Sequence, residues 1–299
     1  MEEPCAPSGS GPPTILARAD GPFGETVLRR RGDVLELVVA GVFAMDSAHT
    51  STEVALARQG LGGLDDAHRV LVGGLGLGYT AQAVLADPRV RELTVVELDA
   101  ALVSWARAGL VPVAAQVLAE PRTTLVADDV LNAVPALAAG GLDAVLLDVD
   151  NGPGFLVHPS NTGVYTAPFL RACARALRPG GVVAVWSADL APALRTVLGA
   201  EVGRCEEILL PVERDGRAFT YALYLAARRC PYLDHERSAH RGRSMDSPSP
   251  IRYQFIRSPR VALSRTRRSG RPSAAIAPAS TATCTTCPTT TCPDAGRSP

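Results

Sequence analysis

Acidic side chains stand directly after several apolar runs of the sequence, and their number favours a positively charged ligand. Asp148 and Asp150 follow the run at residues 144–147, on a loop rich in proline and glycine. Acids that cluster at one edge of a fold are electrostatically costly unless a cation shares the site with them. A sulfonium, an amine or both would meet that need, so these residues indicate a small cationic substrate.

A glycine-rich turn follows the run at residues 70–72 and favours a nucleoside. Gly74, Gly76 and Gly78 let a ligand approach the backbone closely, and they expose main-chain N–H groups at the start of the next helix. Glu97 ends the following run, about 20 residues further on, where a carboxylate can accept two hydrogen bonds from ribose hydroxyls. Together these features predict a bound nucleoside.

Asp128 follows the third run, at residues 124–126, and two interpretations stay open for it. Its carboxylate can accept a hydrogen bond from an adenine amino group, or Asp128 or Asp129 can cap a helix that begins near Val130. Residues 76–81 also fit the dinucleotide pattern GxGxxA loosely. We do not favour a nicotinamide cofactor, because residues 73–75 make the turn too long and the fourth run also ends in an acid.

A parallel sheet would bring these residues to one edge, and the order of the apolar runs predicts such a sheet. Near-continuous apolar runs that alternate with helices are typical of parallel strands covered on both faces. The runs lie at residues 70–72, 93–97, 124–126, 144–147 and 182–186. Two last runs, 207–210 and 219–225, have no helix between them and should close the sheet as an antiparallel pair. The predicted fold is α/β, a doubly wound, mostly parallel, seven-stranded Rossmann-like sheet with its ligand at the carboxyl edge.

Four segments are expected along the 299 residues: a disordered N-terminus (1–20), a small β-hairpin and a helix (21–60), a nucleoside-binding catalytic domain (61–229) and a disordered tail (230–299). The hairpin turns at Gly32-Asp33, and the helix runs from Thr52 to Gly60. Residues 1–230 carry 19 arginines against 26 acids, whereas residues 231–299 carry 11 arginines against 4 acids. The tail is rich in Ser, Thr, Pro and Arg but has few aromatic residues, so we favour disorder over a nucleic-acid partner.

Composition also limits the compartment and the metal content. No stretch approaches the roughly 18 to 20 uninterrupted apolar residues that span a bilayer, and the N-terminus lacks the basic and apolar regions of a secretion signal. We expect a cytoplasmic protein with no membrane partner. Cys284, Cys287 and Cys292 form CxxCxxxxC without a fourth ligand nearby, so we expect no metal.

With these motifs, the sequence resembles the spermidine synthase family over about residues 23–227. The turn at 74–78 matches the glycine motif of that family, and Glu97 and Asp128 match its ribose-binding and adenine-binding acids. Asp148 matches the catalytic aspartate. Residues 164–169, followed by Arg178-Pro-Gly-Gly181, are the most family-specific match.

The resemblance implies a class I methyltransferase-like fold and an aminopropyl transfer. In this family, decarboxylated S-adenosylmethionine donates the group to a small-molecule amine such as putrescine, without a metal. Asp148 would be the base, with Asp150 or Asn151 holding the amine. The glycine turn, Glu97 and Asp128 would hold the nucleoside, and the resemblance also suggests a homodimer.

Four positions depart from the family pattern: Leu77 replaces an acid that contacts the donor amine, and Ala44, Ser51 and Trp186 replace a glutamine, a tyrosine and a glutamine. Three hypotheses therefore stay open. They are an aminopropyltransferase, a methyltransferase that uses intact S-adenosylmethionine on an unknown acceptor, and a nucleoside-binding or polyamine-binding protein without turnover. Leu77 is easier to accept in the second case, because the donor amine then lies beside its own carboxylate. Glu53 has two interpretations, an acid at the pocket mouth or a solvated helix start.

Overall fold

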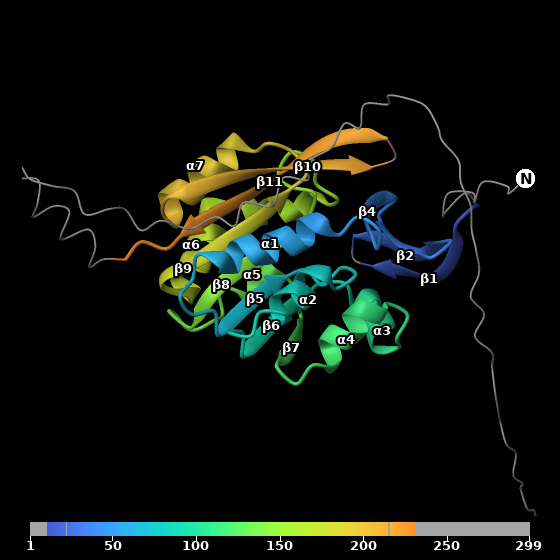
Figure 1. Cartoon of the computed structure of the whole chain (residues 1–299), viewed down its shortest axis with the longest axis horizontal. Helices are drawn as coiled ribbons and strands as arrows, with labels where there is room; N and C mark the ends of the chain where they lie inside the picture. The colour runs from blue at the N-terminus through green and yellow to red at the C-terminus, as the bar shows by residue number, and fades with distance from the viewer. Residues whose placement is uncertain (1–10, 22, 215, 231–299) are drawn as a thin grey trace, which may run out of the picture. The chain divides into compact units, whose positions relative to one another are not determined.

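The computed structural model describes residues 11–21, 23–214 and 216–230, which lie within one compact unit of the chain (Figure 1). Our predictions of disorder for residues 1–10 and 231–299 lie outside the described residues. The same holds for Cys284, Cys287 and Cys292, on which the expectation of no zinc site partly rested. The predicted domain boundaries themselves remain predictions.

The N-terminal part of the chain forms a four-stranded antiparallel sheet in the order β1-β2-β3-β4. Its strands are β1 (Thr14–Gly21), β2 (Gly24–Arg31), β3 (Val34–Val39) and β4 (Val42–Asp46). The predicted hairpin is present as β2 and β3, turning at Gly32 with φ of 58°. The expectation of a disordered N-terminus to residue 20 is wrong for residues 14–20, which pair with β2 along the ladder. Strand β1 buries no side chain fully, although Leu16 and Ala17 pack against the first core cluster. Its main-chain pairing with β2 is not revealed by apolar patterning.

The main sheet has seven strands, as predicted, and their order is β10-β11-β9-β8-β5-β6-β7. Its strands are β5 (Arg69–Gly73), β6 (Glu92–Glu97), β7 (Thr123–Ala127), β8 (Leu142–Leu147), β9 (Leu177–Ser187), β10 (Cys205–Arg214) and β11 (Arg217–Ala227). Strands β5 to β9 are parallel, and β11 lies antiparallel between β9 and β10. The strand order changes direction at β5, so a crevice is expected beyond its carboxyl end.

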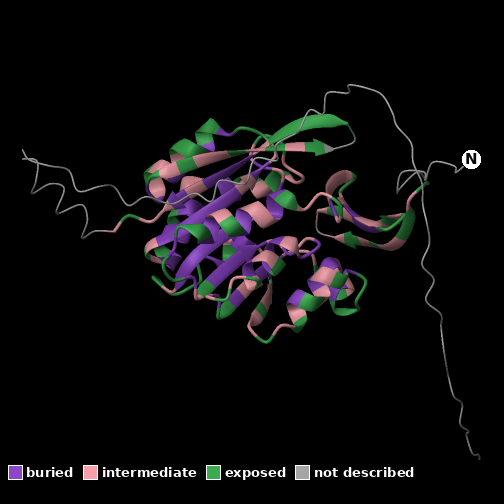
Figure 2. Ribbon diagram, viewed as in Figure 1, coloured by how far each residue is buried: buried purple, intermediate pink, exposed green. Residues whose placement is uncertain are grey.

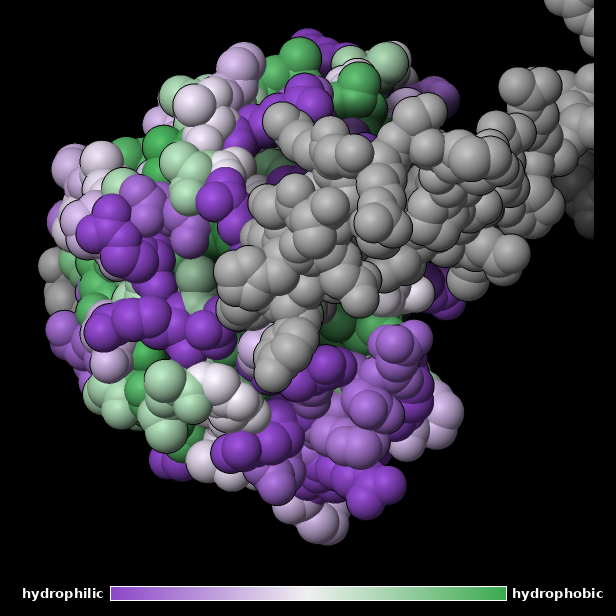
Figure 3. All heavy atoms as spheres, turned by 90° about the vertical axis from the view of Figure 1, so that its left-hand side faces the viewer, coloured by the Kyte–Doolittle hydropathy of each residue, from purple (hydrophilic) through white to green (hydrophobic). Residues whose placement is uncertain are grey.

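Helices cover both faces of the main sheet, as near-continuous apolar strands require. They are α1 (Ser51–Gly62), α2 (Tyr79–Leu85), α3 (Ala100–Arg107), α4 (Pro112–Ala119), α5 (Val130–Ala133), α6 (Ala167–Ala176) and α7 (Pro192–Glu201), with a 3-10 helix η1 (Pro159–Tyr165). Figure 2 shows the central strands of this sheet as the buried centre of the molecule, while the edge strands β7 and β10 are partly exposed. In the view of Figure 3, the surface is mostly hydrophilic with hydrophobic side chains interspersed.

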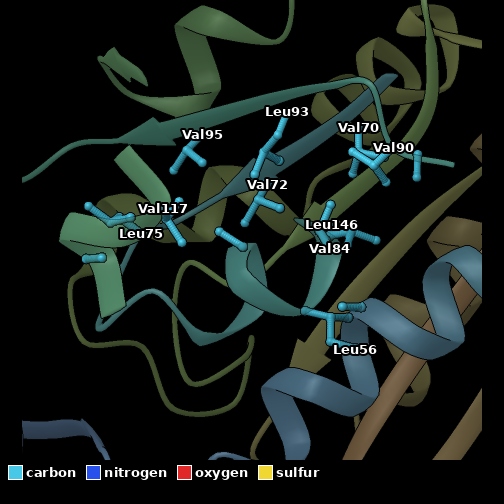
Figure 4. Packing of buried hydrophobic residues seen from close by; sticks show 14 of the residues in the cluster. Leu56, Val70, Val72, Leu75, Val84, Val90, Leu93, Val95, Val117 and Leu146 are labelled. Atoms are coloured by element: carbon cyan, nitrogen blue, oxygen red, sulfur yellow. The ribbon is translucent and has the colours of Figure 1, made fainter. Parts of the chain in front are cut away.

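Alternation along the strands divides the core into two clusters. In β5, Val70 and Val72 contact one cluster with residues of α1, α2 and α4, and Leu71 faces the other with residues of α6 and α7. Figure 4 shows the first cluster, where Leu56 of α1 and Val84 of α2 meet the strands. The two cores fix the carboxyl ends of β5, β6 and β8 relative to one another.

In the described part of the chain, no single helix is long and apolar enough to cross a membrane. Helices α3 and α4 pass that test only as a pair, bent by 82° at the break between them. Both helices place apolar side chains in the first core cluster, among them Leu102, Ala106 and Val117.

Candidate active site

A cavity of about 1290 Å³, counted with its open mouth, lies where the N-terminal sheet meets the carboxyl ends of β5, β6 and β8. Residues of both sheets line it, including Gly24 and Leu37 from β2 and β3. Most residues predicted for the ligand site line this cavity: Gly74, Gly76, Glu97, Asp128, Asp148 and Asp150. Gly78 is the exception, because it is not part of the wall.

The glycine turn is held by close approaches that leave no room for a side chain. At Gly74, with φ of +91°, an added Cβ would lie 2.1 Å from the carbonyl oxygen of Asp148. At Gly78, with φ of +99°, it would lie 2.7 Å from the main-chain nitrogen of Ala114 in α4. Gly78 is also the N-cap residue of α2. Gly78 thus fixes the turn against α4, while Gly74 brings the turn against the loop that carries Asp148.

The carboxylate of Glu97 is fixed by main-chain donors. Its Oε2 accepts from Leu75 N at 2.7 Å, and its Oε1 accepts from Asp99 N at 2.7 Å. The side chain is 8% exposed, and burial raises its pKa while these N–H groups oppose the rise. Each carboxylate oxygen still has lone pairs for further donors such as ribose hydroxyls. Glu97 is therefore both the anchor of the glycine turn and a wall of the cavity.

Asp99 was not among the predicted site residues, yet it also lines the cavity. Its Oδ1 caps α3 by accepting from Ala101 N, and its Oδ2 accepts from the hydroxyl of Thr26 at 2.5 Å. Thr26 belongs to β2, so this hydrogen bond connects the N-terminal sheet to the end of β6. The sequence feature that could have identified Asp99 is its position two residues after Glu97.

The structure separates the two adjacent acids after β7. Asp129 is the N-cap of α5, and its Oδ1 accepts from Leu131 N at 2.8 Å. The Oδ1 of Asp128 accepts from Asp129 N at 2.7 Å and from Asn132 Nδ2 at 3.1 Å. Capping thus belongs to Asp129, which leaves Asp128 on the cavity wall for the role that the sequence proposed.

Asp148 stands after β8 with a hydroxyl donor beside it. The Oγ1 of Thr80 in α2 donates to Asp148 Oδ2 at 2.6 Å. Burial raises the pKa of Asp148 against the lowering effect of this hydrogen bond. A carboxylate with a raised pKa is better matched to taking a proton near neutral pH than an ordinary one.

Asp150 has a different environment from Asp148. Its Oδ1 accepts from Asn151 N at 2.6 Å and from Val157 N at 2.7 Å, and its Oδ2 accepts from Asn161 Nδ2 at 2.5 Å. Both oxygens therefore organise the loop from Asn151 to Asn161. Its predicted catalytic role remains a prediction, and the observed contacts are those of a residue that shapes a loop.

Glu53 is the site residue whose importance the sequence understated. It lies in the first turn of α1, lines the cavity and is only 8% exposed, so the interpretation as a solvated helix start is wrong. Burial and, after it, the charge of Asp148 raise the pKa of Glu53 to about 7. A glutamate at a helix start carries no sequence signal that distinguishes this burial from ordinary exposure.

The cavity wall is strongly acidic. Seven carboxyl groups line it, and no arginine does so among the described residues: Glu53, Glu97, Asp99, Asp128, Asp129, Asp148 and Asp150. His158 is the basic side chain of that wall, and its ring lies 4.2 Å from the ring of Phe23. No group of His, Cys, Asp or Glu in the part of the chain that the structure describes is arranged to hold a metal ion. An organic cation is the ligand that this wall favours.

The four residues that differ from the family pattern do not lie together in the structure. Leu77 is 1% exposed and packs in the apolar core, and it is not part of the cavity wall. Ala44 and Trp186 line the cavity, while Ser51 is exposed at the start of α1. The indole Nε1 of Trp186 is buried without a hydrogen-bond partner among the described residues, and its ring lies 5.1 Å from that of Tyr221.

The residues that form this site lie in a segment that matches a known protein family. Residues 52–197, which include the glycine turn, Glu97, Asp128 and Asp148, match the family described as "Spermine/spermidine synthase domain". This segment of the chain is similar to a spermine/spermidine synthase domain. The segment holds every sequence-predicted site residue.

Curated relatives of this domain include two kinds of enzyme. A polyamine aminopropyltransferase of Mycobacterium tuberculosis is 34% identical over 175 residues, which is 57% of this chain and 32% of the relative. Putrescine N-methyltransferase 3 of Nicotiana tabacum is 36% identical over 123 residues, covering 41% of this chain and 31% of the relative. The match thus spans about a third of the length of these relatives.

Solved structures show the same fold. Spermidine synthase from Thermotoga maritima superposes with a TM-score of 0.62 at 16% identity, covering 72% of this chain and 73% of that one. A spermidine synthase in complex with the transition-state analogue AdoDATO gives the same TM-score and identity, covering 72% of this chain and 74% of that one. The chain therefore shares the fold of these spermidine synthase structures.

Proposed function

We propose that this chain transfers an aminopropyl group from decarboxylated S-adenosylmethionine to a small diamine. The acidic cavity wall carries this proposal. Both substrates are cations, and the donor lacks the carboxylate of intact S-adenosylmethionine. Seven carboxyl groups and no arginine among the described lining residues favour such a pair over a ligand with its own negative charge.

The nucleoside end of the donor would lie against β5, β6 and β7. Glu97 would accept from the ribose hydroxyls, and Asp128 from the adenine amino group. Gly74 and Gly76 would leave the backbone open to the sulfur side of the donor. The donor carbon next to sulfur would then face the loop after β8, where Asp148 stands.

The reaction needs a proton acceptor and an in-line approach. A protonated amine first gives one proton to a carboxylate, for which Asp148 is suited by its position and its raised pKa. The free lone pair on nitrogen attacks the carbon beside sulfur, and the C–S bond breaks with its electron pair staying on sulfur. The products are a neutral thioether and a new ammonium, and the rate depends on holding nitrogen and carbon in line.

A methyl transfer from intact S-adenosylmethionine is the second candidate. Leu77 favours it, because this position offers no carboxylate to the donor amine and its side chain is buried in the core. The similarity to a putrescine N-methyltransferase supports the same alternative. The carboxylate of the intact donor would then need main-chain N–H groups of the glycine turn.

One experiment separates the two candidates. Purified protein is incubated with putrescine and either decarboxylated or intact S-adenosylmethionine, and the product amines are identified by mass spectrometry. Spermidine formed from the decarboxylated donor supports the proposal, and methylputrescine formed from the intact donor supports the alternative. No product from either donor would overturn both. The cytoplasmic location and the homodimer remain predictions.

A further inference from the structure

Helix α1 places Glu53 at a fixed depth in the cavity. Leu56 and Ala57 of this helix are fully buried. At Gly60, an added Cβ would lie 2.5 Å from Leu146 Cδ2, so α1 packs against β8 as closely as its backbone allows. Strand β8 leads directly into the loop with Asp148. The packing therefore ties the first turn of α1 to the position of the expected base.

The groups that face Glu53 are mostly acidic. They are Asp148 from the loop after β8, Asp46 from the end of β4 and Tyr79 from α2. The hydroxyl of Thr52 donates a hydrogen bond to Glu53, from Oγ1 to Oε2 at 2.8 Å. Asp148 likewise receives a hydroxyl, that of Thr80. Two neighbouring carboxyl groups of the cavity wall with neutral donors repel each other when both are ionised, and a cation or a proton between them removes the repulsion.

We propose that Glu53 and Asp148 form a pair of carboxylates that binds the acceptor amine and takes its proton, and that Asp150 only positions the loop beside them. This inference rests on the proposed transfer to an amine. It assigns the second acceptor-binding carboxylate to α1, where the sequence had suggested Asp150 or Asn151. The observed contacts agree, because Asp150 already accepts three hydrogen bonds, from Asn151, Val157 and Asn161. Glu53 and Asp148 each accept one side-chain hydrogen bond, from a hydroxyl.

The proton balance of the pair follows from its electrostatics. The pKa of Glu53, raised to about 7 by burial and Asp148, leaves the pair holding a proton for part of the time at neutral pH. A cation that enters the cavity favours the ionised pair, so this proton leaves to solvent. The deprotonated pair of carboxylates can then accept one proton from the acceptor ammonium before the nitrogen attacks the donor carbon. The thioether leaves, the product ammonium keeps its remaining hydrogens, and the pair returns its proton to solvent.

Proton release on binding gives a test that does not require turnover. Putrescine is titrated calorimetrically at pH 7 into the protein saturated with methylthioadenosine, in buffers of different ionisation enthalpy. We expect the wild type to release a fraction of a proton per putrescine, and Glu53→Gln to release much less. Glu92→Gln, which changes an exposed carboxylate of β6 outside the cavity, serves as the matched control and should behave as the wild type. Unchanged proton release in Glu53→Gln would overturn the inference.

Kinetics provide the second test. With the donor and amine that give product, Glu53→Gln should lower kcat by about 10²-fold and move the acid limb of the pH profile to lower pH, while Glu53→Asp should restore part of kcat. Asp150→Asn should mainly raise KM and leave the limb in place. If the acid limb of the pH profile shifted in Asp150→Asn but not in Glu53→Gln, the proposed pairing of Glu53 with Asp148 would be wrong. Failure of the proposed function can be distinguished from failure of the pair. In that case, proton release would still depend on Glu53, but neither donor would give a product.

Discussion

The two halves of the cavity hold their carboxylates with different sets of donors. In the nucleoside half, Glu97, Asp99 and Asp128 each accept from main-chain N–H groups. In the amine half, Glu53 and Asp148 receive hydroxyl groups and face each other's charge. Main-chain donors preorganise an acid to receive hydroxyls and amino groups, whereas a repelling pair is most stable with a cation or a proton. Under the proposed function, recognition and proton transfer would be divided between the two halves.

Replacing the expected base should give the largest effect. Asp148→Asn keeps the shape of the side chain but removes its capacity to take a proton, so we expect kcat/KM to fall by about 10² to 10⁴-fold. Binding of methylthioadenosine, measured by calorimetry, should stay within about threefold, since that ligand belongs to the other half. Asp65→Asn, at an exposed position, is the control. A large loss of nucleoside binding in Asp148→Asn would remove the division between the halves.

Truncating the anchor of the nucleoside half should cost stability as well as binding. Glu97→Ala leaves the N–H groups of Leu75 and Asp99 without their acceptor, and we expect unfolding free energy to fall by about 3 kcal/mol. Chemical denaturation measures this loss, and titration with methylthioadenosine should show weaker binding. Wild-type stability in this variant would mean that Glu97 does not hold the glycine turn.

The amine half should instead gain stability when its repulsion is removed. The pKa of Glu53 is about 7 in the folded protein against an ordinary value of 4.5. Between these pH values the unfolded chain releases a proton that the folded chain keeps, so unfolding free energy falls as pH rises. Glu53→Gln should remove the contribution of Glu53 to this fall and be more stable than the wild type by about 2 kcal/mol at pH 8, with little difference at pH 4. Thermal denaturation across this range checks it, and a destabilised variant at pH 8 would contradict the argument.

The smallest effect is expected where the N-terminal sheet meets the nucleoside half. Thr26→Val removes the hydroxyl that donates to Asp99 Oδ2, and a lost hydrogen bond to a charged group costs about 1.5 kcal/mol. Part of that cost should appear as weaker binding of methylthioadenosine, because Asp99 lines the cavity. Denaturation and calorimetry of the same variant measure both effects. Serine at this position should restore the wild-type values.

The main sheet was predictable because its strands are buried on both faces. The runs at 70–72 and 144–147 are apolar throughout, and their period and spacing define a parallel sheet without tertiary information. Strand β1 was missed because its side chains stay partly exposed and its stability depends on a partner strand. The pattern of apolar residues within β1 does not indicate that it pairs with another strand.

The candidate site was predictable where position along a strand decides it. Glu97, Asp128 and Asp148 follow strand ends, so topology alone brings them to one edge. Glu53 comes from a helix start, and only the packing of α1 on β8 shows that it is buried. The choice between Asp128 and Asp129 as the cap, and the contacts of Asp150, depended on hydrogen bonds that spacing does not determine.

The contact between Gly74 and the Asp148 carbonyl has a consequence for the order of events. The two loops lie so close there that a methyl group would not fit, so one cannot shift without moving the other. A donor that settles onto the glycine turn would also adjust the residue that receives the proton. Sequential kinetics, in which the sulfonium enters ahead of the amine, would be the natural outcome.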